Sequence, residues 1–164
     1  MSAFVITLLL ATLSCSLVAG FLFAYAVVIM PGIKTLDDEA FIRAFQVTDR
    51  VIQDNHPLFM VVWLGSALSL VICAFLGFGL LEGVDRVLLL VATALYLVGV
   101  QISTVRVHLP LNNALQNIDP VQMNADELRA ARLAFEPRWN RSNEIRTFIA
   151  CCVAGLLLVL ALRL

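Results

Sequence analysis

The chain has 164 residues, of which 61% are hydrophobic and only 14% are charged. A soluble domain carries roughly 45–50% apolar and about 25% charged residues, and a domain this small has too little interior to bury the excess. The net charge of -1 leaves no strongly basic surface for nucleic acid. The composition therefore predicts an integral membrane protein and excludes a nucleic-acid-binding one.

Four apolar runs divide the chain, and each is read as a helix that crosses the bilayer. They cover residues 4–30, 58–81, 87–105 and 147–162. The last run rises only about 24 Å, so we expect the arginines at its two ends to extend it by snorkelling. Backbone groups in lipid must pair within their own segment. The sequence thus predicts an all-α, single membrane domain built as a four-helix bundle.

Small residues within the runs predict close packing between these helices. Gly65 and Gly77 lie in the second run and Gly99 in the third. Small side chains let helix backbones approach each other where no hydrophobic force drives association in lipid.

Two polar segments, residues 31–57 and 106–146, lie on one side of the membrane, because an even number of spans returns both termini to the other side. Of the eleven Lys and Arg residues, nine fall in these segments and two, Arg86 and Arg163, on the side of the termini. The positive-inside rule therefore predicts that the two segments form a cytoplasmic, same-side polar cap and that the termini face outward.

The first cap segment is expected to form an amphipathic helix after the acidic turn at residues 37–39. Its apolar face contains Phe41, Phe45, Thr48 and Ile52, at helical spacing. Charged residues are expected away from that face: Arg43, Asp49, Arg50 and Asp54. Two interpretations remain open. The helix either lies on the membrane or caps the bundle, or it forms a lid over a pocket that faces the membrane.

The second cap segment is expected to contain a helix over residues 125–135 that Glu136-Pro137 breaks. A new helix would begin at Arg138 or Trp139 and continue into the fourth span. On that helix Trp139, Asn143 and Arg146 are spaced at i, i+4 and i+7, so they share one face. A ring, an amide and a guanidinium then point the same way at the membrane boundary.

The chain resembles the anthrone oxygenase-like family of small four-span membrane proteins, most of which have no assigned function. Five short pieces carry the resemblance, in order along the chain. They are Phe23-x-Tyr25 with Val28-Ile29-Met30-Pro31-Gly32; Phe45-Gln46; Asn55; Val107-His108-Leu109-Pro110-Leu111-Asn112-Asn113-Ala114-Leu115; and Trp139-Asn140-Arg141-x-Asn143-x-Ile145-Arg146-Thr147.

The resemblance implies oxidation of a hydrophobic aromatic or quinol-like molecule by O2. Some fungal members of the family oxidise an anthrone to an anthraquinone without a conventional cofactor, because the anthrone carbanion reacts with oxygen directly. Such a site needs a base, donors for the developing oxyanion and a dry pocket for a flat ring. We expect His108 to be the base, with His56 as a second candidate.

The other candidate residues follow from the same requirements. Asn112, Asn143 and Arg146 would stabilise oxygen anions, and Phe23, Tyr25, Asn113 and Trp139 would contact the substrate. An alternative is that all of them are interfacial anchors and hydrogen-bonding links between helix ends, since Trp and Tyr gather at membrane interfaces in any case.

Three other functions are alternatives to oxidation. A haem or copper site could use His56 and His108, although we predict no cofactor. A channel or transporter would place acidic or basic residues inside the spans, and the four runs contain none. A non-catalytic accessory subunit, packed in lipid as a homo-oligomer or beside a larger membrane complex, remains the main alternative.

Overall fold

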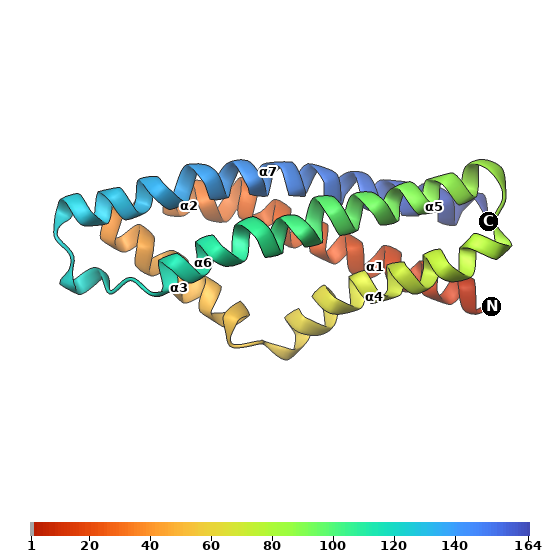
Figure 1. Ribbon diagram of the computed structural model, residues 1–164, viewed down its shortest axis with the longest axis horizontal. Helices are drawn as coiled ribbons and strands as arrows, with labels where there is room; N and C mark the ends of the chain where they lie inside the picture. Colours follow the sequence, from red (N-terminus) through yellow and green to blue (C-terminus); the bar gives the residue numbers. More distant parts are fainter. Residues whose placement is uncertain (1) are drawn as a thin grey trace.

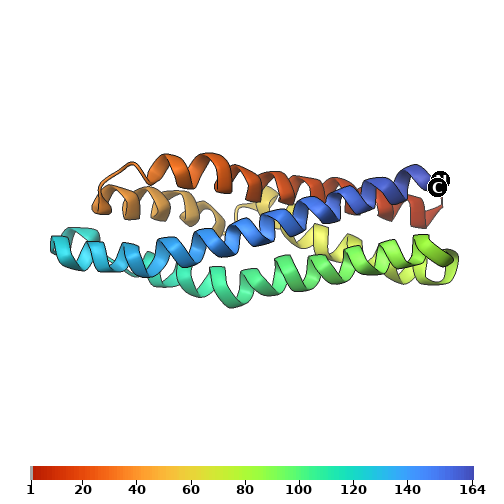
Figure 2. The same cartoon turned by 90° about the horizontal axis from the view of Figure 1, so that it is seen from above.

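The computed structural model describes residues 2–164, and within them it is all-helical. Four helical rods are long and apolar enough to cross a membrane: Ala3–Ile33, Pro57–Leu80, Gly83–Gln116 and Ala125–Arg163. They confirm the predicted four-span bundle of a multi-pass membrane protein. The rods run lengthwise beside each other, with both termini at one end of the bundle (Figures 1 and 2).

Several rods contain more than one type of helix. The first joins α1 (Ala3–Ala24), the π-helix η1 (Tyr25–Ile29) and α2 (Met30–Ile33), and the separate helix α3 (Asp38–Gln53) follows it. The second rod is α4 (Pro57–Leu80). The third joins α5 (Gly83–Leu95), the π-helices η2 (Tyr96–Ile102) and η3 (Thr104–His108), and α6 (Leu109–Gln116). After the 3-10 turn η4 (Pro120–Gln122), α7 (Ala125–Arg163) forms the last rod.

Local sequence accounts for the helix boundaries. Asp37 caps α3 by accepting from the Ala40 amide at 2.8 Å, and Asn124 and Glu127 form a reciprocal capping box at the start of α7. Asn55 has a positive φ of 57° in the turn between α3 and α4. Asparagine tolerates this left-handed conformation better than most residues, so the chain can reverse there without glycine.

The half of the bundle nearest the termini has an apolar core between α1, α4, α5 and α7. Leu8, Leu70 and Leu157 are among its fully buried members. Two glycines allow close approach: a Cβ on Gly77 would lie 2.4 Å from Leu89, and a Cβ on Gly99 would lie 2.7 Å from Ile149. Gly65, by contrast, has open space around it. The predicted close packing therefore occurs at two of these three glycines.

The other half holds a second core between α3, α6 and α7, in which Phe41, Phe45, Phe135 and Trp139 pack together. α3 therefore packs against protein rather than lying alone on the membrane surface. The expectation that Asp49 faces away from the apolar side of this helix is wrong. Its side chain is only 2% exposed, because three polar side chains bind its carboxylate.

The expected break at Glu136-Pro137 is also wrong, because α7 continues through Pro137 to Arg163. Pro137 and Leu133 are both exposed, so the carbonyl that the proline leaves without an amide partner lies on an open face of the helix. Phe135 and Trp139 anchor the opposite face on either side of it. With 39 residues, α7 is about 58 Å long, roughly twice the bilayer hydrocarbon thickness.

Candidate functional site

A cavity of about 450 Å³ lies where the two halves of the bundle meet. Its walls come from α1 and η1, the end of α3, the beginning of α4, the rod from η2 to α6, and α7. In this region α4 runs away from the neighbouring rod (Figure 1). The volume is in the range of small-molecule sites.

Aromatic rings form a continuous wall of this cavity. Neighbouring ring centroids in this wall are 5.0–5.6 Å apart, from Phe21–Tyr25 at 5.0 Å to the stacked pair Phe59–Trp63 at 5.5 Å and Tyr25–Trp139 at 5.6 Å. Six rings line the cavity: Phe21, Tyr25, Phe45, Phe59, Trp63 and Trp139. Such a wall suits a flat, apolar ligand.

Arg146 brings a buried positive charge to the cavity. Its side chain is 5% exposed, and Nε donates to Asn143 Oδ1 at 3.0 Å while Nη1 donates to Thr104 Oγ1 at 3.0 Å. Within residues 2–164 no carboxylate lies within ion-pair distance of its guanidinium. A buried cation is costly unless it is paired, so an anionic group of a ligand would find a preformed partner here.

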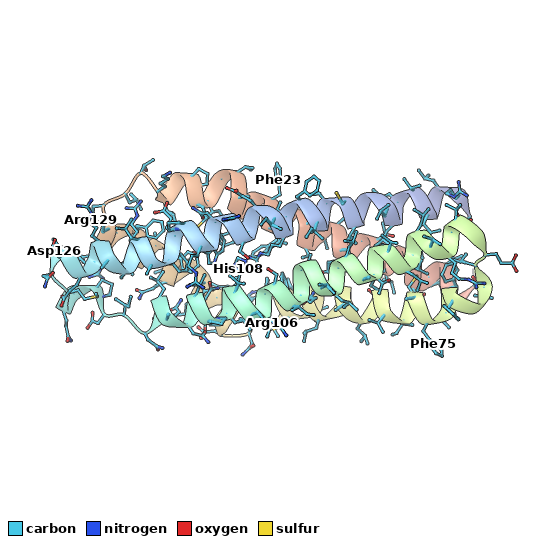
Figure 3. All side chains as sticks on the ribbon, turned by 45° about the horizontal axis from the view of Figure 1, so that its top comes forward. Phe23, Phe75, Arg106, His108, Asp126 and Arg129 are labelled. Carbon is cyan, nitrogen blue, oxygen red and sulfur yellow. The ribbon has the colours of Figure 1, made fainter. Side chains whose placement is uncertain are left out.

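His108 is buried and lines the cavity. It lies near the middle of the bundle (Figure 3). Its Nε2 is 2.9 Å from Ser142 Oγ, while Nδ1 is buried without a partner in residues 2–164. The Nε2 of Gln101, which also lines the cavity, is likewise buried and unpartnered. Unsatisfied polar atoms of this kind are rare in folded proteins, so Gln101 and His108 are candidates for contact with a ligand in the cavity.

Asp49 lines the cavity as well, and polar side chains connect it to the aromatic wall. Asn112 Nδ2 donates to Asp49 Oδ1 at 2.7 Å, and Trp139 Nε1 donates to Asn112 Oδ1 at 2.9 Å. Gln53 and Gln116 donate to Asp49 Oδ2 at 2.8 and 3.1 Å. Asp49 is not among the site residues predicted from the sequence, although its spacing of four from Phe45 and eight from Phe41 puts it on the same helical face.

The π-helical segments coincide with the cavity. Tyr25 lies in η1, Gln101 in η2, and Thr104 and His108 in η3, and all four line the cavity. π-helical turns occur frequently at functional sites. No periodicity in the sequence indicates them, because each changes the helical spacing only locally.

The structure brings most of the predicted site residues together. His108, Asn112, Tyr25, Trp139 and Arg146 all line the cavity. Asn143 is buried behind it, where its Nδ2 donates to the Leu22 carbonyl at 3.2 Å and its Oδ1 holds Arg146.

Three predicted residues lie elsewhere. Phe23 is 52% exposed on the outer face of α1 (Figure 3), and Phe21 lines the cavity in its place. Asn113 is exposed and accepts a hydrogen bond from Gln53 at 3.1 Å. His56 is exposed in the turn before α4 and does not line the cavity that contains His108. The structure therefore does not join the two histidines in one ligand set, and within residues 2–164 no three His, Cys, Asp or Glu side chains gather as a metal site would require.

A comparison with known proteins addresses the resemblance found in the sequence. The sequence model of the anthrone oxygenase family, described as "Anthrone oxygenase", matches residues 57–157. This stretch includes η2 to α6 and the cavity-lining part of α7, while the resembling pieces between residues 23 and 55 precede it. No curated protein and no solved structure matches the chain. Because the match covers more than half of the 164 residues, the chain belongs to the anthrone oxygenase family.

Proposed function

We propose that the protein binds a flat, hydrophobic phenol or ketone in the cavity and promotes its oxidation by O2 without a bound cofactor. The observation that carries this proposal is the unpaired guanidinium of Arg146 beside an aromatic wall. A deprotonated aromatic ring system needs both features, a counter-ion for its oxygen and a face to stack on.

The chemistry assigned to the site has two stages. With Nε2–H donating to Ser142, His108 Nδ1 has no partner within residues 2–164 and removes a proton from a ring methylene that is conjugated with a carbonyl, and Arg146 stabilises the enolate oxygen that results. The electron-rich ring then reduces O2. For a methylene group the sum is CH2 plus O2 giving C=O plus H2O, so the ketone gains one oxygen atom and the other leaves as water.

The surrounding groups keep the site dry and oriented. Ser142 fixes the imidazole through Nε2, and Asn143 fixes the guanidinium through Nε. The aromatic rings exclude water, which strengthens the interaction between Arg146 and the oxyanion.

The proposed activity is tested with the full-length protein in lipid nanodiscs and anthrone itself as the probe. We expect quinone absorbance to appear with consumption of one O2 per product, faster than in nanodiscs containing the Arg146→Met variant. Equal rates for the two proteins would contradict the proposal. Mass and absorption spectra of the purified protein add a second readout, because a haem band or stoichiometric copper would overturn the cofactor-free mechanism.

The main alternative is a non-catalytic accessory subunit. That role requires the polar side chains to satisfy each other, whereas His108 Nδ1 and Gln101 Nε2 have no partner within residues 2–164. A second polypeptide that copurifies in fixed ratio, together with the absence of anthrone turnover, would favour this alternative.

The orientation in the membrane forms part of the proposal. The cap made by α3, α6 and the first half of α7 is cytoplasmic, because most Lys and Arg residues lie there. A cysteine introduced at the exposed Asp126 position should react with an impermeant thiol reagent only after the cytoplasmic face is opened, and labelling of intact cells would reverse the assignment.

A further inference from the structure

The cavity has two chemically different rims. On one side the exposed lining residues are Gln53 and Asn55, from the end of α3 and the turn after it. On the other side they are Leu64, Val105 and Leu109, which are 58%, 60% and 44% exposed. The first rim is polar and is expected to face water, whereas the second is apolar and is expected to face hydrocarbon.

The apolar rim continues two stripes of exposed side chains that run along the spans. On α4 the stripe contains Leu58, Val61, Leu64 and Leu68. On the neighbouring rod it contains Val98, Ile102, Val105 and Leu109. Helical spacing of three or four places each set on one face, and contiguous exposed apolar surface of this kind marks contact with lipid.

The position along the rods agrees with this assignment. Leu64 lies seven residues beyond Pro57, the first residue of α4, which is about 10 Å along the helix. Arg106, beside Val105, is exposed (Figure 3), and a charged side chain at this position is expected at the boundary of the hydrocarbon region. The apolar rim at Leu64 and Val105 therefore lies near the cap-side end of the acyl-chain region. Arg146, His108 and Trp139 lie buried at the inner end of the cavity.

The geometry points to lateral entry: the ring substrate reaches the cavity from the bilayer, between α4 and η3, and is a membrane-dissolved lipophile that carries an apolar substituent. Its oxygen-bearing ring lies inside, against Arg146 and the aromatic wall. Its apolar substituent leaves between Leu64 and Val105 into the lipid. This inference rests on the proposed function and goes further by naming the route and the kind of substrate.

The test uses two naphthoquinones that differ only in the presence of a long alkyl tail, added to the protein in phosphatidylcholine nanodiscs. The chain has two tryptophans, and a Trp63→Phe background leaves Trp139 at the inner end of the cavity as the single reporter. We expect quenching of Trp139 by both probes. The tailed probe should reach half-maximal quenching at a lower total concentration than the tailless one. The ratio of the two concentrations should match the factor by which the tail enriches the probe in the bilayer.

The decisive variant narrows the apolar rim without touching the inner end. Leu64→Phe/Val105→Phe should slow the onset of quenching by the tailed probe at least about tenfold. The matched control, Leu68→Phe/Val98→Phe, changes two residues on the same stripes that are equally exposed but do not line the cavity, and it should leave the onset unchanged.

Each contrary result has a distinct meaning. Quenching of Trp139 by both probes at equal total concentrations, with no slowing in the rim variant, would overturn lateral entry and leave the proposed function standing. Slower onset of quenching in Gln53→Phe instead, which narrows the polar rim without adding a tryptophan, would also overturn it, in favour of entry from water. If neither probe quenches Trp139 in the parent protein, the cavity does not bind flat rings, and the proposed function and the inference fail together.

Discussion

The two halves of the bundle bury different kinds of side chain. Toward the termini, α1, α4, α5 and α7 enclose a core of aliphatic residues, with fully buried Leu8, Leu70 and Leu157. Toward the cap, the same rods and α3 bury a carboxylate, an imidazole and a guanidinium at Asp49, His108 and Arg146. The cavity with the aromatic wall lies where the two halves meet, and all three of these polar groups line it.

This difference separates the part that stabilises the fold from the part suited to chemistry. Apolar packing gives a span its helix contacts, whereas desolvated charges reduce stability unless partners compensate for them. Buried polar groups in a membrane protein are therefore functional candidates. Substitutions in the two halves should then separate stability from ligand binding, and the following variants test that separation.

The largest effect is expected for Arg146→Met. The methionine fills similar space but removes the counter-ion, so oxidation of anthrone should fall by about 100-fold or more. Thermal unfolding should change little, because an unpaired buried charge is removed with it. Asn143→Ala, which frees the guanidinium that Asn143 holds, should likewise lower activity more than stability. Turnover in nanodiscs measures the activity of each variant, and the unfolding temperature in one mild detergent, used for all variants, measures its stability.

Leu157→Ala provides the matched control on the same helix. Its side chain is fully buried in the other half, and the cavity it leaves should cost about 2–5 kcal/mol of stability, while the affinity for a naphthoquinone stays near that of the parent. If Arg146→Met unfolds as readily as Leu157→Ala, the guanidinium is a structural link and the contrast between the halves disappears.

A second variant, Asp49→Asn, tests whether the carboxylate holds the cap together. The new amide group can accept at one atom only, although Asn112, Gln116 and Gln53 all donate to Asp49. Leaving buried donors unpaired should cost about 1–3 kcal/mol and weaken ligand binding through the displaced Asn112. Asp54→Asn, at an exposed position of the same segment, should be neutral in thermal unfolding, and an equal loss in both variants would contradict this role.

Two glycine variants test how closely the helices of the apolar half are packed. Gly77→Ala places a Cβ within 2.9 Å of Phe4 and closer still to Leu89, so overpacking should cost about 1–3 kcal/mol. Gly65→Ala on the same helix meets open space and should be neutral or slightly stabilising. Unfolding temperatures decide the comparison, and equal values for the two variants would show that α1, α4 and α5 adjust freely at Gly77.

The smallest effect is expected for Ser142→Ala, which removes the partner of His108 Nε2. One lost hydrogen bond corresponds to about 1 kcal/mol, or a several-fold fall in turnover, and Ser142→Thr should restore it. A positioning role predicts this rescue in the catalytic rate with unchanged unfolding temperature. Failure of the threonine variant to recover any rate would remove Ser142 from the site.

The spans could be predicted from sequence because the backbone of an apolar segment in lipid must satisfy its own hydrogen bonds by forming a helix. An uncharged run of sufficient length therefore indicates a span. The shared face of Trp139, Asn143 and Arg146 was equally accessible, because it depends on helical spacing alone, and all three side chains are buried.

The remainder of the site depends on contacts that are distant in sequence. Asp49 was expected outside because it is charged, and its burial depends on amides that reach it from α6 together with Gln53 on its own helix. The rings of Phe59 and Trp63 lie within an apolar run where nothing distinguishes the inner face from the lipid face. Pro137 shows the reverse case, since a strong helix-breaking residue is overruled by packing on both of its sides.

The π-helical segments also affect how such a site can evolve by insertion or deletion of residues. A wider turn holds one residue more than an α-helical turn, so it alters the angular phase of everything that follows by about 100°. Removing a single residue within 96–108 would rotate His108 away from Ser142 while α6 and its apolar face shifted with it. Insertions and deletions in this stretch are therefore expected to switch the site on or off, whereas the same events in the hairpin between α4 and α5 would leave it intact.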